Sequence, residues 1–296
     1  MDWTMQEAGS LRGKTFLVTG SNAGIGFSTT RQLAGRGARV VMACRSPDKG
    51  QAALQQLRSA VPDADASLMT LDLASLASVR AFAAEFLAQH DRLDVLINNA
   101  GVMMPPAGRT ADNFETQFGT NVIGHFVLTG LLLPLLNRTP QARVVTMSSV
   151  AHWLAKIDFD NLNAEKGYSA GRAYAQSKLA NLMFTYELQR RLQRSGATTI
   201  SLGAHPGGTR SDLGRHNLLL RLASPLAQST DQGALPSLRA AVDPAARGGE
   251  YYGPGGLATM VGPAVRQRSS RYSHDESVAA RLWQACEELG GMRYLS

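Results

Sequence analysis

Tyr174 and Lys178 stand four residues apart in the stretch AYAQSKLAN, which covers residues 173–181. On a helix, residues at this spacing lie on one face, so the phenol and the ammonium group can meet over a shared point. A lysine beside a tyrosine favours the phenolate, and such a couple could exchange a proton with a bound oxygen atom. The same spacing also occurs between ordinary neighbours on an amphipathic helix, so the pair alone leaves both interpretations open.

A glycine-rich stretch, TGSNAGIG at residues 19–26, could perform a second kind of chemistry. Gly20 permits a tight turn, and Gly24 and Gly26 allow the backbone to approach a ligand closely. The N–H groups and the dipole at the start of a following helix then suit a pyrophosphate. The stretch predicts a dinucleotide site if it joins a first strand to a first helix.

The stretch ACRSPDK, residues 43–49, indicates which dinucleotide is bound. An NAD site usually has an acid here to hold the ribose 2′-hydroxyl, but Cys44 takes its place and Arg45 follows. Arg45 can form a two-pronged contact with a 2′-phosphate, and Lys49 lies one helical turn further on. We expect NADP(H) to be preferred, with NAD(H) possible. The alternative is that Arg45 only caps a loop.

The elements that must position these residues follow one another in a regular alternation. Strands are predicted at 14–20, 38–44, 66–73, 93–101, 142–149 and 198–208, and helices at 24–37, 46–60 and 76–89. Strands separated by helices pair in parallel through right-handed crossovers. The sequence therefore predicts an α/β fold with a single Rossmann-type, doubly wound parallel sheet flanked by helices, in one NAD(P)-binding domain over residues 1–296.

The bulk properties exclude several classes of protein. The 296 residues are 44% hydrophobic, which is enough for a substantial core. The net charge of +7 comes from scattered arginines, which favour a solvated surface over a nucleic-acid site. Cys44 and Cys286 are too few for a disulfide framework. His125 and His152 have no ligand partners at metal spacing, so no metal is expected.

The same properties predict where the protein resides. Residues 1–14 carry charges and lack the apolar core of a signal peptide. The most apolar stretch, residues 126–136, is too short to span a bilayer and contains Pro134, so we expect a buried helix there. With cysteines this sparse, we expect a soluble, cytoplasmic protein without a membrane span.

Seven motifs in order identify a family resemblance. They are TGSNAGIG (19–26), LDL (71–73), NNAG (98–101), TNVIGHF (120–126), VVTMSSVA (144–151), YAQSK (174–178) and HPGGTRSDL (205–213). Over residues 12–215, this series resembles the short-chain dehydrogenase/reductase superfamily. MSSVAHW and YAQSKLANLMFTYELQRRL resemble its retinol dehydrogenase and protochlorophyllide-reductase-like branch. The order of motifs decides between the two interpretations of the Tyr174–Lys178 pair in favour of catalysis.

The resemblance implies four catalytic residues. Tyr174 would be the general acid/base, beside Lys178. Ser149 would hydrogen-bond the substrate oxygen, with Ser148 as the alternative that the strand register disfavours. Asn121 would interrupt a helix and hold a water that passes protons to Lys178.

The resemblance also implies a set of cofactor-binding residues. Asp72 and Leu73 would flank the adenine, and Thr209 would contact the carboxamide. Ser211 stands where relatives often have threonine. The expected set is Gly20, Ser21, Asn22, Gly24, Ile25, Gly26, Arg45, Asp72, Leu73, Asn98, Ala100, Gly101, Tyr174, Lys178, Pro206, Gly207, Thr209 and Ser211.

Reduction of a carbonyl explains why these residue types are needed. It requires hydride at carbon and a proton at oxygen. A tyrosine with a pKa of about 10 is poorly matched to neutral pH. Lys178 and a cationic nicotinamide are expected to lower the pKa of Tyr174, and roughly three units correspond to about 4 kcal/mol. Ser149 would help to hold the developing oxyanion.

The segment 205–262 is expected to cover the substrate. Its apolar part, residues 213–228, would form a mobile lid over an apolar carbonyl or alcohol compound, or else an ordinary packed helix. Residues 248–262 would add a late strand and a loop. Retinoid handling is not expected, because relatives that act on retinol at membranes usually have a hydrophobic N-terminal anchor. His205, before the Pro-Gly turn, is expected to be structural.

The sequence also bears on two rival functions and on the oligomeric state of the protein. A cofactor-binding regulatory or scaffold protein without turnover is the alternative function, but it would not need all four catalytic residues. An epimerase or dehydratase would need a larger C-terminal domain than the roughly eighty residues after Ser211. The resemblance implies a possible homodimer through the helices of residues 112–137 and 173–194.

Overall fold

The computed structural model describes residues 2–209 and 227–295. Within these residues, one sheet has the strand order β3-β2-β1-β4-β5-β6-β7-β8, and only β8 pairs antiparallel to its neighbour. The strands are β1 (Thr15–Thr19), β2 (Arg39–Cys44), β3 (Ala66–Thr70), β4 (Val95–Asn98), β5 (Arg143–Met147), β6 (Ile200–Ala204), β7 (Tyr251–Pro254) and β8 (Ala264–Arg266). The predicted α/β fold is confirmed.

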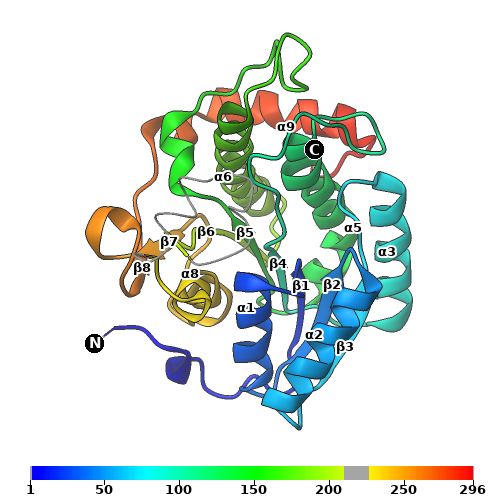
Figure 1. Ribbon diagram of the computed structural model, residues 1–296, viewed down its shortest axis with the longest axis vertical. Helices are drawn as coiled ribbons and strands as arrows, with labels where there is room; N and C mark the ends of the chain where they lie inside the picture. Colours follow the sequence, from blue (N-terminus) through cyan, green and yellow to red (C-terminus); the bar gives the residue numbers. More distant parts are fainter. Residues whose placement is uncertain (1, 210–226, 296) are drawn as a thin grey trace.

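Helices cover both faces of the sheet (Figure 1). One face carries α1 (Gly24–Ala34), α2 (Pro47–Ala60) and α8 (Thr230–Val242), and the other carries α3 (Leu76–Gln89), α5 (Gly124–Arg138), α6 (Ala170–Arg194) and α9 (Glu276–Gly290). Short helical turns complete the described chain: η1 (Met5–Ala8), α4 (Thr116–Phe118), η2 (Gly119–Ile123), η3 (Val150–Leu154), η6 (Leu257–Thr259) and η7 (Arg271–His274).

The apolar strands build both halves of the core. In β1, Phe16 and Val18 join the cluster on the α1–α2–α8 face, whereas Leu17 joins the cluster on the opposite face. This follows from the period of two in a strand, with both faces covered. The strands therefore appear in the sequence as continuous hydrophobic runs. Their C-terminal ends form one edge of the sheet, and the buried core on both faces fixes the position of this edge.

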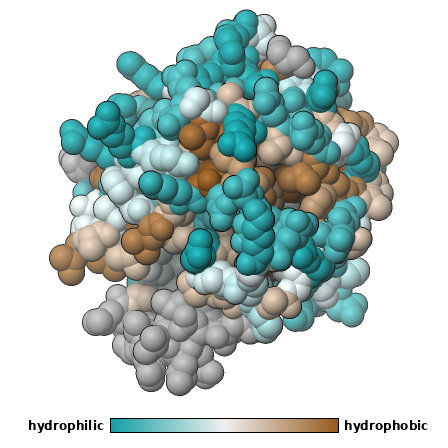
Figure 2. Space-filling view, turned by 90° about the horizontal axis from the view of Figure 1, so that it is seen from above, coloured by the Kyte–Doolittle hydropathy of each residue, from teal (hydrophilic) through white to brown (hydrophobic). Residues whose placement is uncertain are grey.

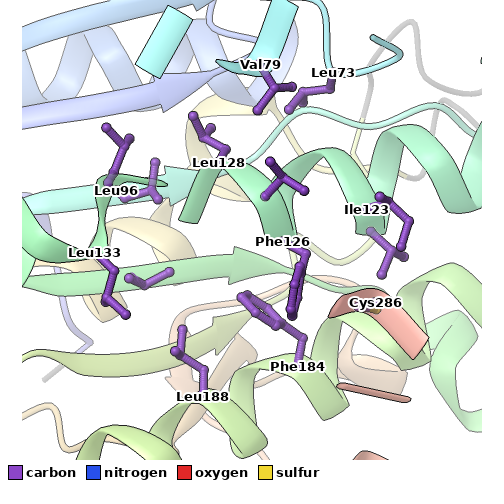
Figure 3. Packing of buried hydrophobic residues seen from close by; sticks show 14 of the residues in the cluster. Leu73, Val79, Leu96, Ile123, Phe126, Leu128, Leu133, Phe184, Leu188 and Cys286 are labelled. Atoms are coloured by element: carbon purple, nitrogen blue, oxygen red, sulfur yellow. The ribbon is translucent and has the colours of Figure 1, made fainter. Parts of the chain in front are cut away.

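Helix α9 packs across the pair of helices α5 and α6. The ring centroids of Phe126 and Phe184 lie 5.8 Å apart, and the Trp283 ring of α9 lies 5.0 Å from the Phe126 ring. Figure 3 shows Phe126 and Phe184 facing each other within this cluster, with Cys286 of α9 beside them. The chain's own α9 thus covers helices on which the predicted homodimer would depend, and the dimer stays a prediction.

The predicted buried helix around residues 126–136 lies in this core. The longer stretch Thr116–Arg138 is long and apolar enough to cross a membrane by length and composition, but 83% of its most apolar window is buried inside the fold. Its apolar residues are accounted for by packing against the sheet, α3 and α9.

The surface is largely polar, with a few exposed hydrophobic groups. Figure 2 shows the face seen from above as mostly hydrophilic, with hydrophobic side chains gathered in separate groups. Among the described residues, the most exposed large hydrophobic side chains are Leu154, at 88%, and Leu257, at 83%. Leu154 lies in η3, which follows Ser149 directly, and Leu257 lies in η6.

Candidate active site

The C-terminal ends of β1, β4, β5 and β6 carry the predicted motifs to one edge of the sheet. Parallel pairing aligns these strand ends, and ligands of doubly wound sheets bind outside them. Residues 20–26, 98–102, 148–149 and 205–209 follow these strands. Stretches that are distant in the sequence therefore meet in one region.

The turn between β1 and α1 leaves no room for larger residues. Gly20 has a φ of 66°, and a Cβ there would lie 2.9 Å from the Ala100 Cβ. A Cβ at Gly26 would collide with the carbonyl oxygen of Gly20. Gly24 also has a positive φ, of 55°. Each of the three glycines is therefore needed, either for a positive φ or for a close backbone contact, and this turn is more specific than an ordinary glycine-rich loop.

The start of α1 is suited to an anion. Its N-cap residue is Ala23, which provides no side-chain cap, and the first turn contains no acid. By contrast, α2 is capped by Ser46 and α3 by Ser75 through side-chain hydrogen bonds. The first N–H groups of α1 are thus left to a ligand, and the positive end of its dipole favours negative charge. The turn fits the pyrophosphate of a dinucleotide.

The predicted residues Ser21, Asn22 and Ile25 lie in this same turn. The Ser21 hydroxyl is 3.3 Å from the Cys44 thiol at the end of β2. Burial raises the pKa of the Cys44 thiol, so this thiol stays neutral. Arg45 follows at the exposed surface, and within the described chain no salt bridge or side-chain hydrogen bond holds it. Its guanidinium group can therefore reach a ligand beside the turn.

Asp72 and Leu73 lie after β3, on the other side of β2. The Asp72 carboxylate accepts a 3.0 Å hydrogen bond from the Ala74 N–H, and its own N–H donates to the Ser78 hydroxyl. Leu73 is buried in the core. These bonds fix the loop before α3, and the role of this loop at the adenine stays a prediction.

Asn98, expected with Ala100 to line the cofactor cleft, lies at the end of β4 with its side chain turned into the core. It is buried in the core, and its amide donates to the Thr129 hydroxyl at 3.0 Å and to the Thr146 hydroxyl at 3.4 Å. The physical reason is the strand period, which puts Asn98 on the α5 face with Leu96. Asn99, which the sequence analysis missed, instead reaches the turn after β1, where its amide donates to the Thr19 carbonyl at 2.8 Å.

Residues after β6 form a second tight loop. Gly207 has a φ of 67°, and a Cβ there would collide with the carbonyl oxygen of Met260. Gln228 fastens the loop from the other side, because its side-chain amide donates to the Pro206 carbonyl at 2.7 Å. Thr209 pairs with Gln228 in a β-bridge. Ser211 and most of the segment 213–228 lie outside the described residues, so the lid stays a prediction.

Adjacent serines at the end of β5 have different partners. The Ser148 hydroxyl donates to the Lys178 carbonyl oxygen at 2.7 Å and is buried. Ser149 is half-buried, and its hydroxyl accepts from the Ala151 N–H at 3.2 Å and lies near enough to the Tyr174 hydroxyl to influence the pKa of that phenol. Of the two serines, Ser149 therefore meets the tyrosine.

Tyr174 is buried on α6, and burial is the main influence on its pKa. Burial raises the pKa of Tyr174 to about 12, and the hydrogen bond with Ser149 opposes this rise. The lowering expected from Lys178 together with a bound cationic nicotinamide stays a prediction, and within the protein itself burial is the larger influence. The reason is that loss of solvation outweighs the other influences on the phenol. At neutral pH, Tyr174 is therefore a phenol that can donate a proton.

Lys178 lies one turn further along α6 and is also buried. Its Nζ atom is 5.9 Å from the centre of the Tyr174 ring and donates to the Met147 carbonyl at 3.2 Å. Burial lowers the pKa of Lys178 to about 8. A Cβ at Gly101 would lie 3.4 Å from this Nζ and 3.2 Å from the Asn121 Oδ1. A side chain at Gly101 would therefore crowd both the Lys178 ammonium group and the Asn121 side chain.

Asn121 interrupts a helix, as predicted. It lies in the π-helical turn η2 between α4 and α5, and such turns are frequent at functional sites. Its amide donates to the Val102 carbonyl and the Ser177 hydroxyl, both at 3.0 Å, and its Oδ1 accepts from the Val102 N–H. The Ser177 hydroxyl donates in turn to the Tyr174 carbonyl. Asn121 thus connects the loop after β4 with α6.

His205 and His152 form hydrogen bonds with the backbone of the candidate site. His205 is buried, burial lowers its pKa to about 4, and its Nδ1 accepts from the Gly207 N–H at 3.3 Å. This contact fits the expected structural role. His152 was missed as a functional residue: its Nδ1 lies 2.7 Å from the Ser149 carbonyl, and its Nε2 accepts from the Ser270 N–H. Its place three residues after Ser149 was the available signal.

No group of three or more potential metal ligands occurs in the part of the chain that the structure describes. The site is instead organised around a turn suited to an anion and around a tyrosine, a lysine and a serine. This arrangement is the one that a nicotinamide-dependent exchange of hydride and proton requires.

Comparison with known proteins assigns the chain to a family. A sequence model of the family described as short chain dehydrogenase matches residues 14–218. The chain belongs to this family. It is a short-chain dehydrogenase of the retinol dehydrogenase-like branch, an oxidoreductase of alcohol and carbonyl groups whose fold implies a nicotinamide cofactor.

The relatives of this short-chain dehydrogenase are similar over nearly its whole length. Human retinol dehydrogenase 12 is 46% identical over 290 residues, which cover 96% of this chain and 88% of the relative. Human retinol dehydrogenase 11 is 43% identical, covering 95% and 87%. An uncharacterized protein from Mycobacterium paratuberculosis has a crystal structure with a TM-score of 0.84, 40% identity and 99% of both chains covered.

Proposed function

We propose that this short-chain dehydrogenase uses NADP(H) to interconvert a carbonyl and an alcohol in an apolar small molecule, with Tyr174 as general acid/base. The observation that carries the proposal is that Ser149 lies near enough to the Tyr174 hydroxyl to oppose the rise in its pKa, with the Lys178 Nζ 5.9 Å from the centre of the tyrosine ring. These three groups surround the point where a substrate oxygen would have to lie.

Each residue has a distinct task in the proposed reaction. A bound nicotinamide supplies or accepts the hydride at the substrate carbon. The Tyr174 hydroxyl gives a proton to the substrate oxygen, and the Ser149 hydroxyl donates a hydrogen bond to the same oxygen and stabilises its negative charge. Lys178 stabilises the phenolate that remains. Asn121 holds the loop at Val102 against α6 and would hold the water that passes a proton on to Lys178.

The pKa of Tyr174 determines which protonation state begins each direction of the reaction. Because burial raises it to about 12, the hydroxyl is protonated at neutral pH and ready to act as an acid. Oxidation of an alcohol would start from the phenolate, which needs a higher pH or added positive charge nearby. Tyr174 can therefore serve both directions, as the phenol in reduction and, beside Lys178 and an oxidised nicotinamide, as the phenolate in oxidation.

Arg45 supports the preference for NADP(H). It lies at the end of β2, directly after the neutral Cys44, and no acid occupies that position. A free guanidinium can bind a 2′-phosphate through two N–H groups. A structural neighbour, Pseudomonas aeruginosa RhlG, was solved as an NADP active-site complex; it has a TM-score of 0.65 and 27% identity over 83% of this chain.

The substrate is proposed to be apolar. Trp153 and Leu154, which follow Ser149, are 55% and 88% exposed, and apolar Met260 packs against the loop at Gly207 and Gly208. The relatives carry the name retinol dehydrogenase, so retinal is the first apolar aldehyde to test.

The experiment compares NADPH and NADH with the purified protein and a panel of apolar aldehydes, ketones and quinones that includes retinal. Binding is measured by isothermal titration calorimetry and turnover by the loss of absorbance at the reduced nicotinamide. We expect tight NADPH binding, weaker NADH binding and turnover of at least one apolar carbonyl. Cofactor binding without turnover across the panel would instead favour the regulatory alternative.

A further inference from the structure

His125 lies on α5, one turn after Asn121, and both ring nitrogens are hydrogen-bonded. Its Nδ1 is 3.1 Å from the main-chain carbonyl oxygen of Asn121, and its Nε2 is 2.9 Å from the Thr19 hydroxyl at the end of β1. The ring is 1% exposed, so no water competes for these positions. The side chain thus spans the distance between the first strand and the π-helical turn.

The partners determine which nitrogen carries the proton. A carbonyl oxygen can only accept, so the Nδ1 of His125 must donate to Asn121. The Nε2 then has a lone pair, and it is the nearer acceptor for the single proton of the Thr19 hydroxyl, at 2.9 Å against 3.4 Å for the Ile97 carbonyl oxygen. The remaining lone pairs of the Thr19 hydroxyl accept from the N–H groups of Asn99 at 3.0 Å and Ala100 at 2.9 Å. Every polar atom in this chain of hydrogen bonds is satisfied.

Both ends of the chain lie in the proposed site. Thr19 precedes Gly20, and its hydroxyl fixes the backbone at Ala100, whose side chain faces Gly20. Asn121 is bonded through its amide to Ser177, next to Lys178. A neutral imidazole can make these two bonds at once, because one of its nitrogens donates while the other accepts. Burial lowers the pKa of His125 to about 4, which keeps the ring neutral.

We propose that His125 is a positioning residue that holds the Asn121 carbonyl and the corner formed by Thr19 and Ala100 in a fixed relation. This inference rests on the proposed roles of Asn121 in proton transfer and of the 98–101 loop in cofactor binding. The two nitrogens serve different parts of the reaction. The Nδ1 bond affects turnover through Asn121, and the Nε2 bond affects cofactor affinity through Thr19.

Two substitutions separate these effects. In His125→Asn, the shorter amide can donate to the Asn121 carbonyl but does not reach Thr19. In His125→Gln, the longer side chain can accept from Thr19 with its amide oxygen but loses the bond to Asn121. We expect His125→Asn to raise the Kd for NADPH about tenfold and to leave kcat nearly unchanged. We expect His125→Gln to lower kcat about tenfold with an unchanged Kd, each being the effect of one lost buried hydrogen bond.

The Kd is measured by isothermal titration calorimetry, kcat by steady-state reduction of an apolar aldehyde, and Tm by circular dichroism. His90→Gln is the matched control, because His90 is a partly buried histidine at the end of α3. It should leave Kd and kcat unchanged. His125→Phe should change both parameters.

The inference is overturned if the Asn and Gln variants lower only Tm, or if they change Kd and kcat to the same extent. Both results would mean that His125 only fills space in the core. The Kd for NADPH, measured by calorimetry, does not depend on turnover. A wild-type protein that binds NADPH but reduces nothing would therefore contradict the proposed function, while the Kd of His125→Asn would still test the inference.

Discussion

The Ser148 hydroxyl donates a 2.7 Å hydrogen bond to the main-chain carbonyl of Lys178, and this bond joins the end of β5 to α6. It fixes the distance between the strand that precedes Ser149 and the helix that carries Tyr174. The hydroxyl is buried and used within the protein, so it is not available to a substrate. Two neighbouring serines thus have separate tasks.

This relationship predicts different effects of two alanine substitutions. Ser149→Ala should lower kcat by about a hundredfold or more, as expected for loss of a hydrogen-bond donor to a developing oxyanion, with little change in Tm. Ser148→Ala should lower the free energy of unfolding by about 1–2 kcal/mol, because the Lys178 carbonyl loses a buried donor. Steady-state kinetics and chemical denaturation of both variants check this. Equal losses of kcat would show that the two hydroxyls are interchangeable.

Lys178 should make stability depend on pH in the alkaline range. Its pKa is about 8 in the folded protein, against 10.5 as its ordinary value, so between these values the unfolded chain binds more protons. The free energy of unfolding attributable to Lys178 therefore rises as pH increases from 8 to 10.5. Below pH 8, the buried charge costs about 3 kcal/mol.

Lys178→Met removes this cost, and Asn181 still donates to the Met147 carbonyl that Lys178 leaves. The variant should be inactive but more stable than the wild type at pH 7, and the difference should shrink as pH rises to 9.5. Urea denaturation of both proteins across this range measures it. Stability curves that run parallel from pH 7 to pH 9.5 would contradict a lowered pKa for Lys178.

Arg45 should determine cofactor preference. Arg45→Ala should raise the Kd for NADPH about tenfold or more and leave the Kd for NADH nearly unchanged, because only the 2′-phosphate is lost as a partner. Arg39→Ala is the control, since Arg39 is an exposed arginine at the start of β2 that pairs with Asp65. If Arg45→Ala weakens binding of both cofactors equally, Arg45 does not read the 2′-phosphate.

The position of helix α9 leads to a prediction opposite to the homodimer that the family resemblance implies, namely a monomer. Trp283 packs on Phe126, and Tyr294 fills the space above Gly130, so the chain's own residues cover parts of α5 and α6. Light scattering after size-exclusion chromatography should give a mass close to 31.7 kDa. A stable dimer would mean either that pairing uses another surface or that α9 moves away from α5 and α6. The fraction of dimer formed by Trp283→Ala, measured in the same way, would distinguish these two cases.

The sequence predicted the sheet and the glycine turn because these depend on local order, whereas the choice of Ser149 over Ser148 came from the family resemblance and stays a prediction. Strand register distinguishes the two serines, since consecutive residues at a strand end point in different directions. The same rule, applied to β4, would have placed Asn98 on the core face with Leu96. The resemblance to a cofactor motif did not indicate this direction of the side chain, and the place of Asn98 at the cofactor cleft stays a prediction.

Other features depend on contacts that the sequence does not display. His125 and Thr19 are 106 residues apart, and His152 meets Ser270 across 118 residues. The spacing of Tyr174 and Lys178 indicated that the two side chains share a face, but not how deeply both are buried. Burial decides the direction of both pKa shifts, and it raises the pKa of Tyr174 where proximity to a cation alone would lower it.

Tyr174→Phe tests the central claim most directly, because it removes one hydroxyl and keeps the buried ring. The measurement pairs the turnover of an apolar carbonyl with calorimetric binding of NADPH. We predict that kcat falls by about a thousandfold, within the range for loss of a general acid, while the Kd for NADPH stays within twofold of the wild type. A kcat within tenfold of the wild type would contradict the assignment of Tyr174 as the acid.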